Sequence, residues 1–183
     1  MCAQFREDMA EILLDYDVIQ KRIKELAAEI SRDYEGEEVV LLCILKGAIM
    51  FFSDLARNLT VQCQMDFMSI SSYGDGEKTS GIVRIAKDTD MSITGKHVLI
   101  VEDIMDSGLT LNYLTGLLES RNPASMRLVC LLDKPERREC DITPDYCGFI
   151  IPNKFVVGFG LDYIGRYRHL PYVGVLKPEV YTK

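Results

Sequence analysis

Runs of apolar residues in this chain recur with two different spacings, and the spacings predict strands separated by helices. Continuous apolar runs, many of them β-branched, are typical of strands that are buried on both faces of a parallel sheet. Shorter or more polar runs bounded by turn residues also favour strands. On these grounds strands are expected at 39–45, 61–71, 82–86, 98–101, 126–132, 149–151, 155–159 and 172–176.

Apolar residues spaced three and four apart predict three amphipathic helices, over 18–30, 48–59 and 111–118. Strands and helices therefore alternate, which predicts an α/β fold with a mainly parallel sheet, helices on both faces and right-handed crossovers. There is no repeat, linker or low-complexity tract, so one domain over 1–183 is expected. The segments at the two ends of the chain are expected to form a small lid.

The most informative stretch is VLIVEDIMDSGLT, from Val98 to Thr110. We expect the chain to leave the sheet just beyond Val101 and to open a helix at Ser107, Gly108, Leu109 and Thr110. Open α/β sheets bind ligands at the carboxyl ends of their strands. Glycine allows close approach of a ligand, and the amides and hydroxyls from Asp106 to Thr110 can donate to a phosphate at a helix N-terminus. We call the residues from Asp106 to Thr110 the 106–110 loop.

The stretch from Val98 to Thr110 also carries the carboxylates of Glu102, Asp103 and Asp106. A ligand that suits both the anion-binding amides and these acids must bring hydroxyls, a removable proton or a divalent cation. A sugar phosphate with free ribose hydroxyls and Mg2+ meets all three requirements. The alternative is an ordinary acidic turn capped by Ser107, which leaves three neighbouring carboxylates without compensating partners.

The stretch resembles the phosphoribosyl pyrophosphate (PRPP) motif of type I phosphoribosyltransferases: an apolar strand, two acids, two variable apolar residues, Asp, Ser or Thr, Gly, any residue, and Thr. Within that family the chain is most similar to the hypoxanthine-guanine phosphoribosyltransferases of the shorter bacterial type. The likeness extends from LLCILKGAIMFFSDL to NKFVVGFGLDYIGRYRHLPYVGVL. The block FVVGFGLDY followed by Arg168 resembles the branch that acts on 6-oxopurines.

The resemblance implies transfer of the phosphoribosyl group from PRPP to hypoxanthine or guanine, giving IMP or GMP and pyrophosphate through an oxocarbenium-like transition state. It implies that Glu102 and Asp103 hold Mg2+ and the ribose hydroxyls, with Asp162 near a second Mg2+ through water. Asp106 is expected to act as general base and acid at the purine N7. The terminal lid corresponds to the purine-holding hood of the family, whose members are typically homodimers or homotetramers.

Two further groups of site residues follow from the resemblance. For pyrophosphate, it implies a loop at Lys46 and Gly47, preceded by a cis peptide after Leu45, together with Arg168. From the spacing alone, an ordinary strand-to-helix turn with a surface lysine at Lys46 is the favoured interpretation, and only the resemblance reverses that preference. PRPP is also expected to be covered by a loop containing Ser72 and Tyr73, for which a disordered surface loop is the alternative.

For the purine, the resemblance implies that Lys134 donates to the exocyclic oxygen, Phe155 stacks on the ring and the Val156 backbone pairs with the base edge. A donor at Lys134 excludes adenine, which presents an amino group at that position. Composition alone favours a solvated lysine in DKPERRE and a core position for Phe155.

Composition excludes several other classes. Of 183 residues, 48% are hydrophobic and 27% charged, which is ordinary for a globular enzyme, and the net charge of −7 argues against nucleic acid and anionic membranes as partners. No apolar run reaches the ~20 residues of a membrane span, and the first residues lack a secretory pattern, so a cytoplasmic location is expected. The six cysteines form no CxxC pair, which favours reduced thiols.

Two alternatives to this function remain open at this point. One is a different base specificity, for xanthine or adenine. The other is a regulatory domain that senses PRPP without catalysis, since binding modules share this fold.

Overall fold

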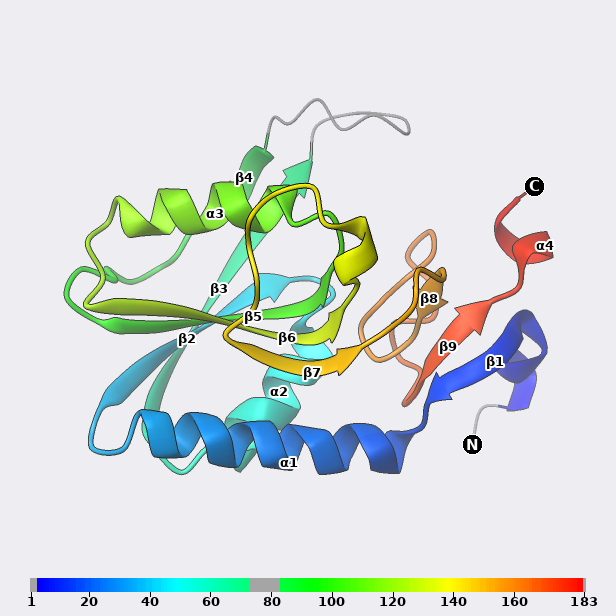
Figure 1. Cartoon of the computed structure of the whole chain (residues 1–183), viewed down its shortest axis with the longest axis horizontal. Helices are drawn as coiled ribbons and strands as arrows, with labels where there is room; N and C mark the ends of the chain where they lie inside the picture. The colour runs from blue at the N-terminus through cyan, green and yellow to red at the C-terminus, as the bar shows by residue number, and fades with distance from the viewer. Residues whose placement is uncertain (1–2, 73–82, 183) are drawn as a thin grey trace.

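The computed structural model describes residues 3–72 and 83–182, which form a six-stranded sheet and a separate three-stranded sheet (Figure 1). The larger sheet has the order β4-β3-β2-β5-β6-β7, and every neighbouring pair is parallel except β3 with β4. The prediction of a mainly parallel α/β sheet is confirmed. Its strands are β2 (Glu38–Leu45), β3 (Gln62–Ser72), β4 (Val83–Lys87), β5 (His97–Met105), β6 (Ser125–Asp133) and β7 (Tyr146–Ile150).

Helices cover both faces of this sheet, as the spacing predicted (Figure 1). One face carries α1 (Tyr16–Asp33) and α2 (Ile49–Asn58), whose apolar stripes pack on Leu41, Cys43 and Val101. The other face carries α3 (Leu109–Glu119), whose leucines pack on the alternate positions Leu42 and Ile100. Successive strand residues point to opposite faces, so each central strand contributes to two apolar cores. That arrangement accounts for continuous apolar runs in place of alternating ones.

Strand β5 is longer than the sequence pattern suggests. It continues through both acids to Met105, and Glu102 pairs with Cys130 while Met105 pairs with Asp133. The expectation that the chain leaves the sheet beyond Val101 is therefore wrong. Polar residues are unusual in a buried parallel strand, but here the neighbouring β6 supplies backbone partners up to its own end. Glu102 and Asp103 are consequently fixed by a rigid strand.

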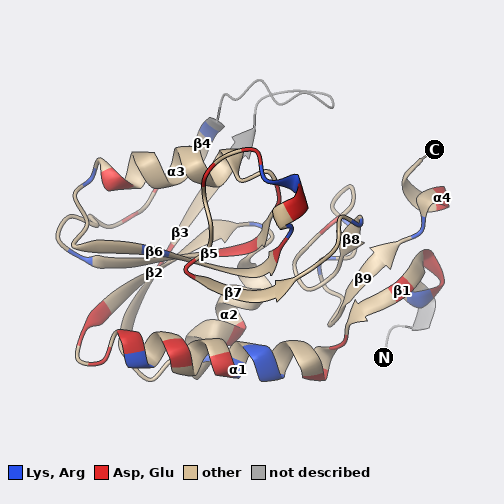
Figure 2. Ribbon diagram, viewed as in Figure 1, with Lys and Arg blue, Asp and Glu red and all other residues tan. Residues whose placement is uncertain are grey.

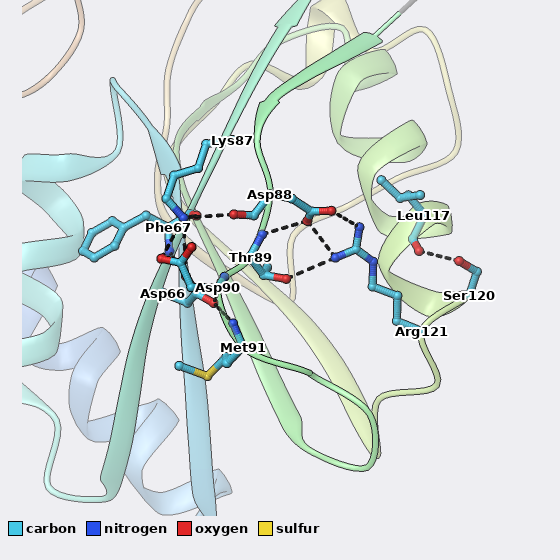
Figure 3. A network of polar contacts seen from close by, with 10 residues as sticks. All are labelled: Asp66, Phe67, Lys87, Asp88, Thr89, Asp90, Met91, Leu117, Ser120 and Arg121. Atoms are coloured by element: carbon cyan, nitrogen blue, oxygen red, sulfur yellow. Dashed lines mark hydrogen bonds and ion pairs between the residues drawn. The ribbon is translucent and has the colours of Figure 1, made fainter.

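A polar network fixes the connection between β4 and β5 (Figure 3). The buried Asp66 carboxylate accepts hydrogen bonds from the amides of Asp90 and Met91 at 2.9 and 3.1 Å. Arg121, just after α3, donates to both carboxylate oxygens of Asp88 at 2.7 and 2.8 Å. These contacts tie the antiparallel edge of the sheet to α3.

The smaller sheet, which we call the hood, has the order β1-β9-β8 and is antiparallel. It joins the two ends of the described chain and lies beyond the carboxyl ends of β5, β6 and β7 (Figure 1), so the expected terminal lid is confirmed. Its elements are β1 (Met9–Leu14), β8 (Val156–Val157), β9 (Val173–Leu176) and the short helices η1 (Ala3–Asp8) and α4 (Pro178–Tyr181).

The strand expected at 155–159 is shortened to two residues. Gly158, Phe159 and Gly160 have φ values of 97°, 48° and 102°, and this left-handed backbone cannot continue a strand. Within 3–72 and 83–182, no helix is long and apolar enough to cross a membrane.

Candidate active site

The 106–110 loop follows β5 and opens α3, as expected. Gly108 is the residue before the helix and has a φ of 82°, a conformation that favours glycine. A Cβ there would also lie 2.7 Å from Ile142 Cγ2, so a larger residue does not fit without movement. The loop borders a cavity of about 240 Å3 that is lined by Ile44, Leu45, Ile70, Glu102, Ile104, Asp106, Ser107, Gly108, Thr110 and Leu111. Loop and acids therefore share one cavity.

The two acids of β5 lie in a poorly hydrated position. Burial, and secondarily the neighbouring Asp103, raises the pKa of Glu102 well above its ordinary value of 4.5. Its Oε2 is buried, and no described residue donates a hydrogen bond to it. Burial also raises the pKa of Asp103 to about 6, although the Ile104 amide donates to its Oδ1 at 2.7 Å. A bound cation or hydroxyl donors would stabilise these carboxylates in their ionised form.

Asp106 lies between two basic side chains that follow β6. Figure 2 shows that acidic and basic ribbon segments lie close together in the region between β6 and β7. Arg137 Nε lies 2.8 Å from its Oδ1, and Lys134 Nζ lies 4.0 Å from its Oδ2. Lys134 is only 6% exposed, so the solvated lysine that composition favoured is not what the structure has. Burial lowers the pKa of Lys134, while Asp106 opposes the decrease.

The segment after β2 lies against Asp103. The peptide bond between Leu45 and Lys46 is cis, as the resemblance implied, and the Lys46 side chain is exposed. A Cβ on Gly47 would lie 1.6 Å from Asp103 Oδ2, and a Cβ on Gly160 would lie 1.9 Å from Gly47 O. The backbone around Gly47 is therefore wedged between the acidic strand and the turn that follows β8, where only glycines fit.

Asp162 and Arg168 form an ion pair close to Asp103. Arg168 Nη2 lies 2.6 Å from Asp162 Oδ1, and Arg168 Nη1 donates to Gly160 O at 2.7 Å. The positive charge of Arg168 lowers and the negative charge of Asp162 raises the pKa of Asp103, which shows that the three groups interact. The structure therefore brings together residues from three separate parts of the sequence: 46–47, 102–103 and 160–168.

Phe155 lies at the start of the hood. The residue is 41% exposed, and its ring stacks on that of Tyr181, with centroids 4.8 Å apart and planes at 29°. The core position that composition favoured is therefore wrong. Val156 belongs to β8, an edge strand of the hood, so one side of its backbone is free of a neighbouring strand. Ser72 is the last residue of β3, and Tyr73 lies outside the described residues.

Among the described residues, the acidic strand offers a metal ion a pair of carboxylates. In the part of the chain that the structure describes, no three His, Cys, Asp or Glu side chains are grouped as a metal site. Glu102 and Asp103 provide a pair, and Asp162 is engaged by Arg168 and by the Gly165 amide at 2.7 Å. This is the donor set of Mg2+ sites in which one or two carboxylates act together with substrate oxygens and water.

The sequence pattern did not reveal the role of the segment after Lys134. Its charges, DKPERRE, are typical of a solvated turn. In the structure Arg137 and Arg138 reach back to the 106–110 loop from the segment that follows β6, the strand next to β5. The only available signal was the position of this segment after a strand expected in the same sheet, and the sequence does not order those strands.

A larger hollow, about 750 Å3, lies at the opposite end of the sheet, where α1 ends and β2 and β3 begin. Its lining includes Lys24, Arg32, Glu35, Glu37 and Glu38, side chains of both signs at a solvated surface. The half-buried acids Glu102 and Asp103, the 106–110 loop and the hood are all at the other end, so the smaller cavity is the candidate active site.

Comparison with known proteins specifies the family. Residues 9–164 match the model of the phosphoribosyl transferase domain. The hypoxanthine-guanine phosphoribosyltransferase of Bacillus subtilis is 48% identical over 176 residues, which is 96% of this chain and 98% of that protein. The bifunctional protein TilS/HprT of Listeria monocytogenes is also 48% identical, but the chain spans only 27% of its length.

The solved structures show the same relationship. A hypoxanthine phosphoribosyltransferase from Staphylococcus aureus superposes with a TM-score of 0.97 at 48% identity, over 100% of both chains. The chain therefore belongs to the phosphoribosyl transferase domain family, and within it to the hypoxanthine-guanine phosphoribosyltransferases.

Proposed function

We propose that this protein is a purine-salvage enzyme that transfers the phosphoribosyl group of PRPP to N9 of hypoxanthine or guanine, giving IMP or GMP and pyrophosphate. The observation that carries the proposal is the placement of two half-buried acids, Glu102 and Asp103, directly before a turn at a helix N-terminus whose amides suit an anion. A ribose bearing a 5′-phosphate and free hydroxyls matches that combination, and a plain phosphate does not.

The anionic groups of PRPP have two separate sets of donors. The 5′-phosphate is assigned to the 106–110 loop, where amides and the hydroxyls of Ser107 and Thr110 border the cavity. Leu109, with an exposed side chain, contributes its backbone amide, which in this structure donates a long hydrogen bond of 3.4 Å to Ser107 Oγ. Pyrophosphate is assigned to the backbone at Lys46 and Gly47 and to Arg168, whose guanidinium suits phosphate oxygens.

Mg2+ is the cofactor that best fits the acidic pair. The buried Glu102 Oε2 lacks a described donor, and hard carboxylate oxygens are the ligands that Mg2+ takes alongside substrate phosphates. Glu102 and Asp103 would hold the ion and the ribose hydroxyls, and Asp162 would act through water. Bound Mg2+ would offset negative charge on the departing pyrophosphate.

The purine is assigned to the space between the hood and the end of β6. Phe155 presents a partly exposed ring for stacking, and the free edge of β8 offers the Val156 backbone to the base. Lys134 donates to the exocyclic oxygen of hypoxanthine or guanine. Because its ammonium is buried, facing it with the amino group of adenine would leave two donors unpaired.

Asp106 is the residue assigned to proton transfer at the purine N7. Its carboxylate borders the cavity and is held by Arg137 from one side, with Lys134 Nζ 4.0 Å away. A positioned carboxylate can share the N7 proton as N9 bonds to the ribose. The negative charges of Asp106, Glu102 and Asp103 also favour the positive charge that develops on the sugar.

The proposal has three wider parts. Ser72 and Tyr73 are proposed to contact PRPP, and the location is proposed to be cytoplasmic. A homodimer or homotetramer is proposed because large apolar side chains such as Met65, Tyr113 and Ile150 are exposed by 54%, 46% and 74%. Analytical ultracentrifugation measures the assembly directly.

The activity is tested by pyrophosphate release from PRPP and Mg2+ with hypoxanthine, guanine, xanthine or adenine in turn. Rapid release with hypoxanthine and guanine supports the proposal. Faster pyrophosphate release with adenine than with hypoxanthine or guanine would show that the enzyme has a different base specificity. Binding of PRPP with no pyrophosphate release in the presence of any of the four bases would instead indicate a regulatory module.

A further inference from the structure

Arg138 has no part in the activity described so far, yet it forms two contacts beneath the 106–110 loop. Its Nη1 donates to the Asp106 carbonyl oxygen at 2.8 Å, and its Nη2 pairs with the Asp133 carboxylate. The two side chains are only 14% and 10% exposed. An arginine at the end of a charged surface turn is ordinarily solvated, so its burial against this loop requires an explanation.

Neighbouring residues of the same segment bind the next carbonyl of the loop. The Glu139 amide donates to Ser107 O at 2.9 Å, and Cys140 Sγ lies 3.6 Å from the same oxygen. Gly108 packs so closely that an added Cβ would lie 2.7 to 3.1 Å from Ile142, Cys140 and Arg138. Residues 138–142, which we call the buttress, therefore cover the carbonyl side of the loop.

The buttress determines which way the loop peptides face. Each peptide has its carbonyl and amide on opposite sides, so holding the carbonyls of Asp106 and Ser107 on the buttress turns the next amides away from it. Among the described residues, none accepts a hydrogen bond from the amides of Ser107 and Gly108. These donors are left for a ligand, and the buried guanidinium adds positive charge behind them.

We propose that Arg138 is a positioning residue for the 5′-phosphate of PRPP and of the nucleotide product. The proposal rests on the function proposed above, which assigns that phosphate to the 106–110 loop. Arg138 touches no reacting atom; it acts by fixing the Asp106 carbonyl and thereby the amides that follow. Arginine suits this task because its planar fork reaches a carbonyl and a carboxylate at once, which a lysine ammonium does less well.

A purely structural role makes a different prediction. If Arg138 only neutralised the buried Asp133, its loss would lower stability and weaken every ligand to a similar degree. A positioning role instead weakens ligands that carry the 5′-phosphate and leaves those without it nearly unchanged. IMP and inosine differ only by that phosphate, so the ratio of their dissociation constants is the decisive measurement.

The experiment is calorimetric titration of IMP and of inosine into the full chain and its variants R138M, R138K and R121M. R138M is expected to weaken IMP roughly tenfold or more, the usual effect of losing a charged hydrogen bond, with inosine changed by less than about twofold. R138K, which keeps the charge, is expected to restore part of the loss. R121M removes an arginine that pairs with Asp88 far from the site (Figure 3). The ratio of its dissociation constants for IMP and inosine should therefore match that of the wild-type protein.

Two results would overturn the role of Arg138 without touching the proposed function. One is an unchanged IMP affinity in R138M; the other is an equal loss for IMP and inosine. Wild-type protein that binds IMP no better than inosine would refute the phosphate site and the proposal together. Should R138M fail to fold because Asp133 is left unpaired, the double variant R138M/D133N removes both charges and is judged by the same ratio.

Discussion

The acidic strand β5 gives the sharpest test of the site, because its carboxylates destabilise the folded protein when no metal is bound. We predict that Asp103→Asn makes the protein more stable in the absence of Mg2+ while it strongly lowers activity. Asparagine has nearly the same shape and keeps an acceptor for the Ile104 amide, which donates to Asp103 Oδ1 at 2.7 Å. The substitution therefore removes the charge and leaves the local backbone contact.

The size of the effect follows from the pKa. Burial raises the pKa of Asp103 from 3.8 to about 6, and at about 1.4 kcal/mol per tenfold change in proton affinity the ionised form is disfavoured by up to about 3 kcal/mol. The folded state binds this proton more tightly than the unfolded state. The destabilisation of the folded state by ionised Asp103 is therefore complete above about pH 6, decreases as the pH falls, and vanishes below the ordinary pKa of 3.8.

Thermal unfolding in EDTA between pH 4 and pH 8 measures this directly. For a chain of this size each kcal/mol corresponds to roughly 2–4 °C in Tm. The Tm of D103N should therefore lie several degrees above that of the wild type at pH 8 and close to it at pH 4. The exposed Asp141 provides a matched control, D141N, for which no such trend is expected. A D103N protein that is less stable at pH 8, or equally shifted at both pH values, would refute the reasoning.

Three further predictions concern the ligand-binding residues. Asp106→Asn should lower kcat by about 100-fold or more, while IMP affinity measured by calorimetry stays within a few-fold; unchanged turnover would remove Asp106 from the mechanism. Lys134→Gln should lower kcat/KM for hypoxanthine roughly tenfold or more but not that for adenine, and equal losses for both bases would contradict the specificity role. Gly108→Ala should weaken IMP more than Gly36→Ala, because both glycines have φ of 82° but only at Gly108 would a Cβ clash; equal effects would place the loss in backbone strain alone.

The sequence pattern predicted the α/β architecture because burial on both faces leaves a signature that needs no tertiary information. Continuous apolar runs gave β2, β5 and β6, and helical spacing gave α1, α2 and α3. The same logic failed at the end of β5, where Glu102 and Asp103 look like turn residues. Only the pairing with β6 shows that the strand continues.

The candidate site was predictable only in part, for a related reason. The 106–110 loop is contiguous in sequence, so its composition alone indicates an anion-binding turn. Arg137 and Arg138 reach that loop because β6 lies beside β5, an order of strands that no local pattern encodes. The shortening of β8 was equally hidden, since Phe159 has a φ of 48° that is rare for a residue other than glycine.

The central claim is that a nucleotide phosphate binds the peptide amides of the 106–110 loop. A crystal structure of the protein with GMP tests it most directly. The account predicts phosphate oxygens within hydrogen-bond distance of the amides from Ser107 to Thr110, with the guanine ring against Phe155. Density for the phosphate at any other place, such as the hollow where α1 ends, would contradict it.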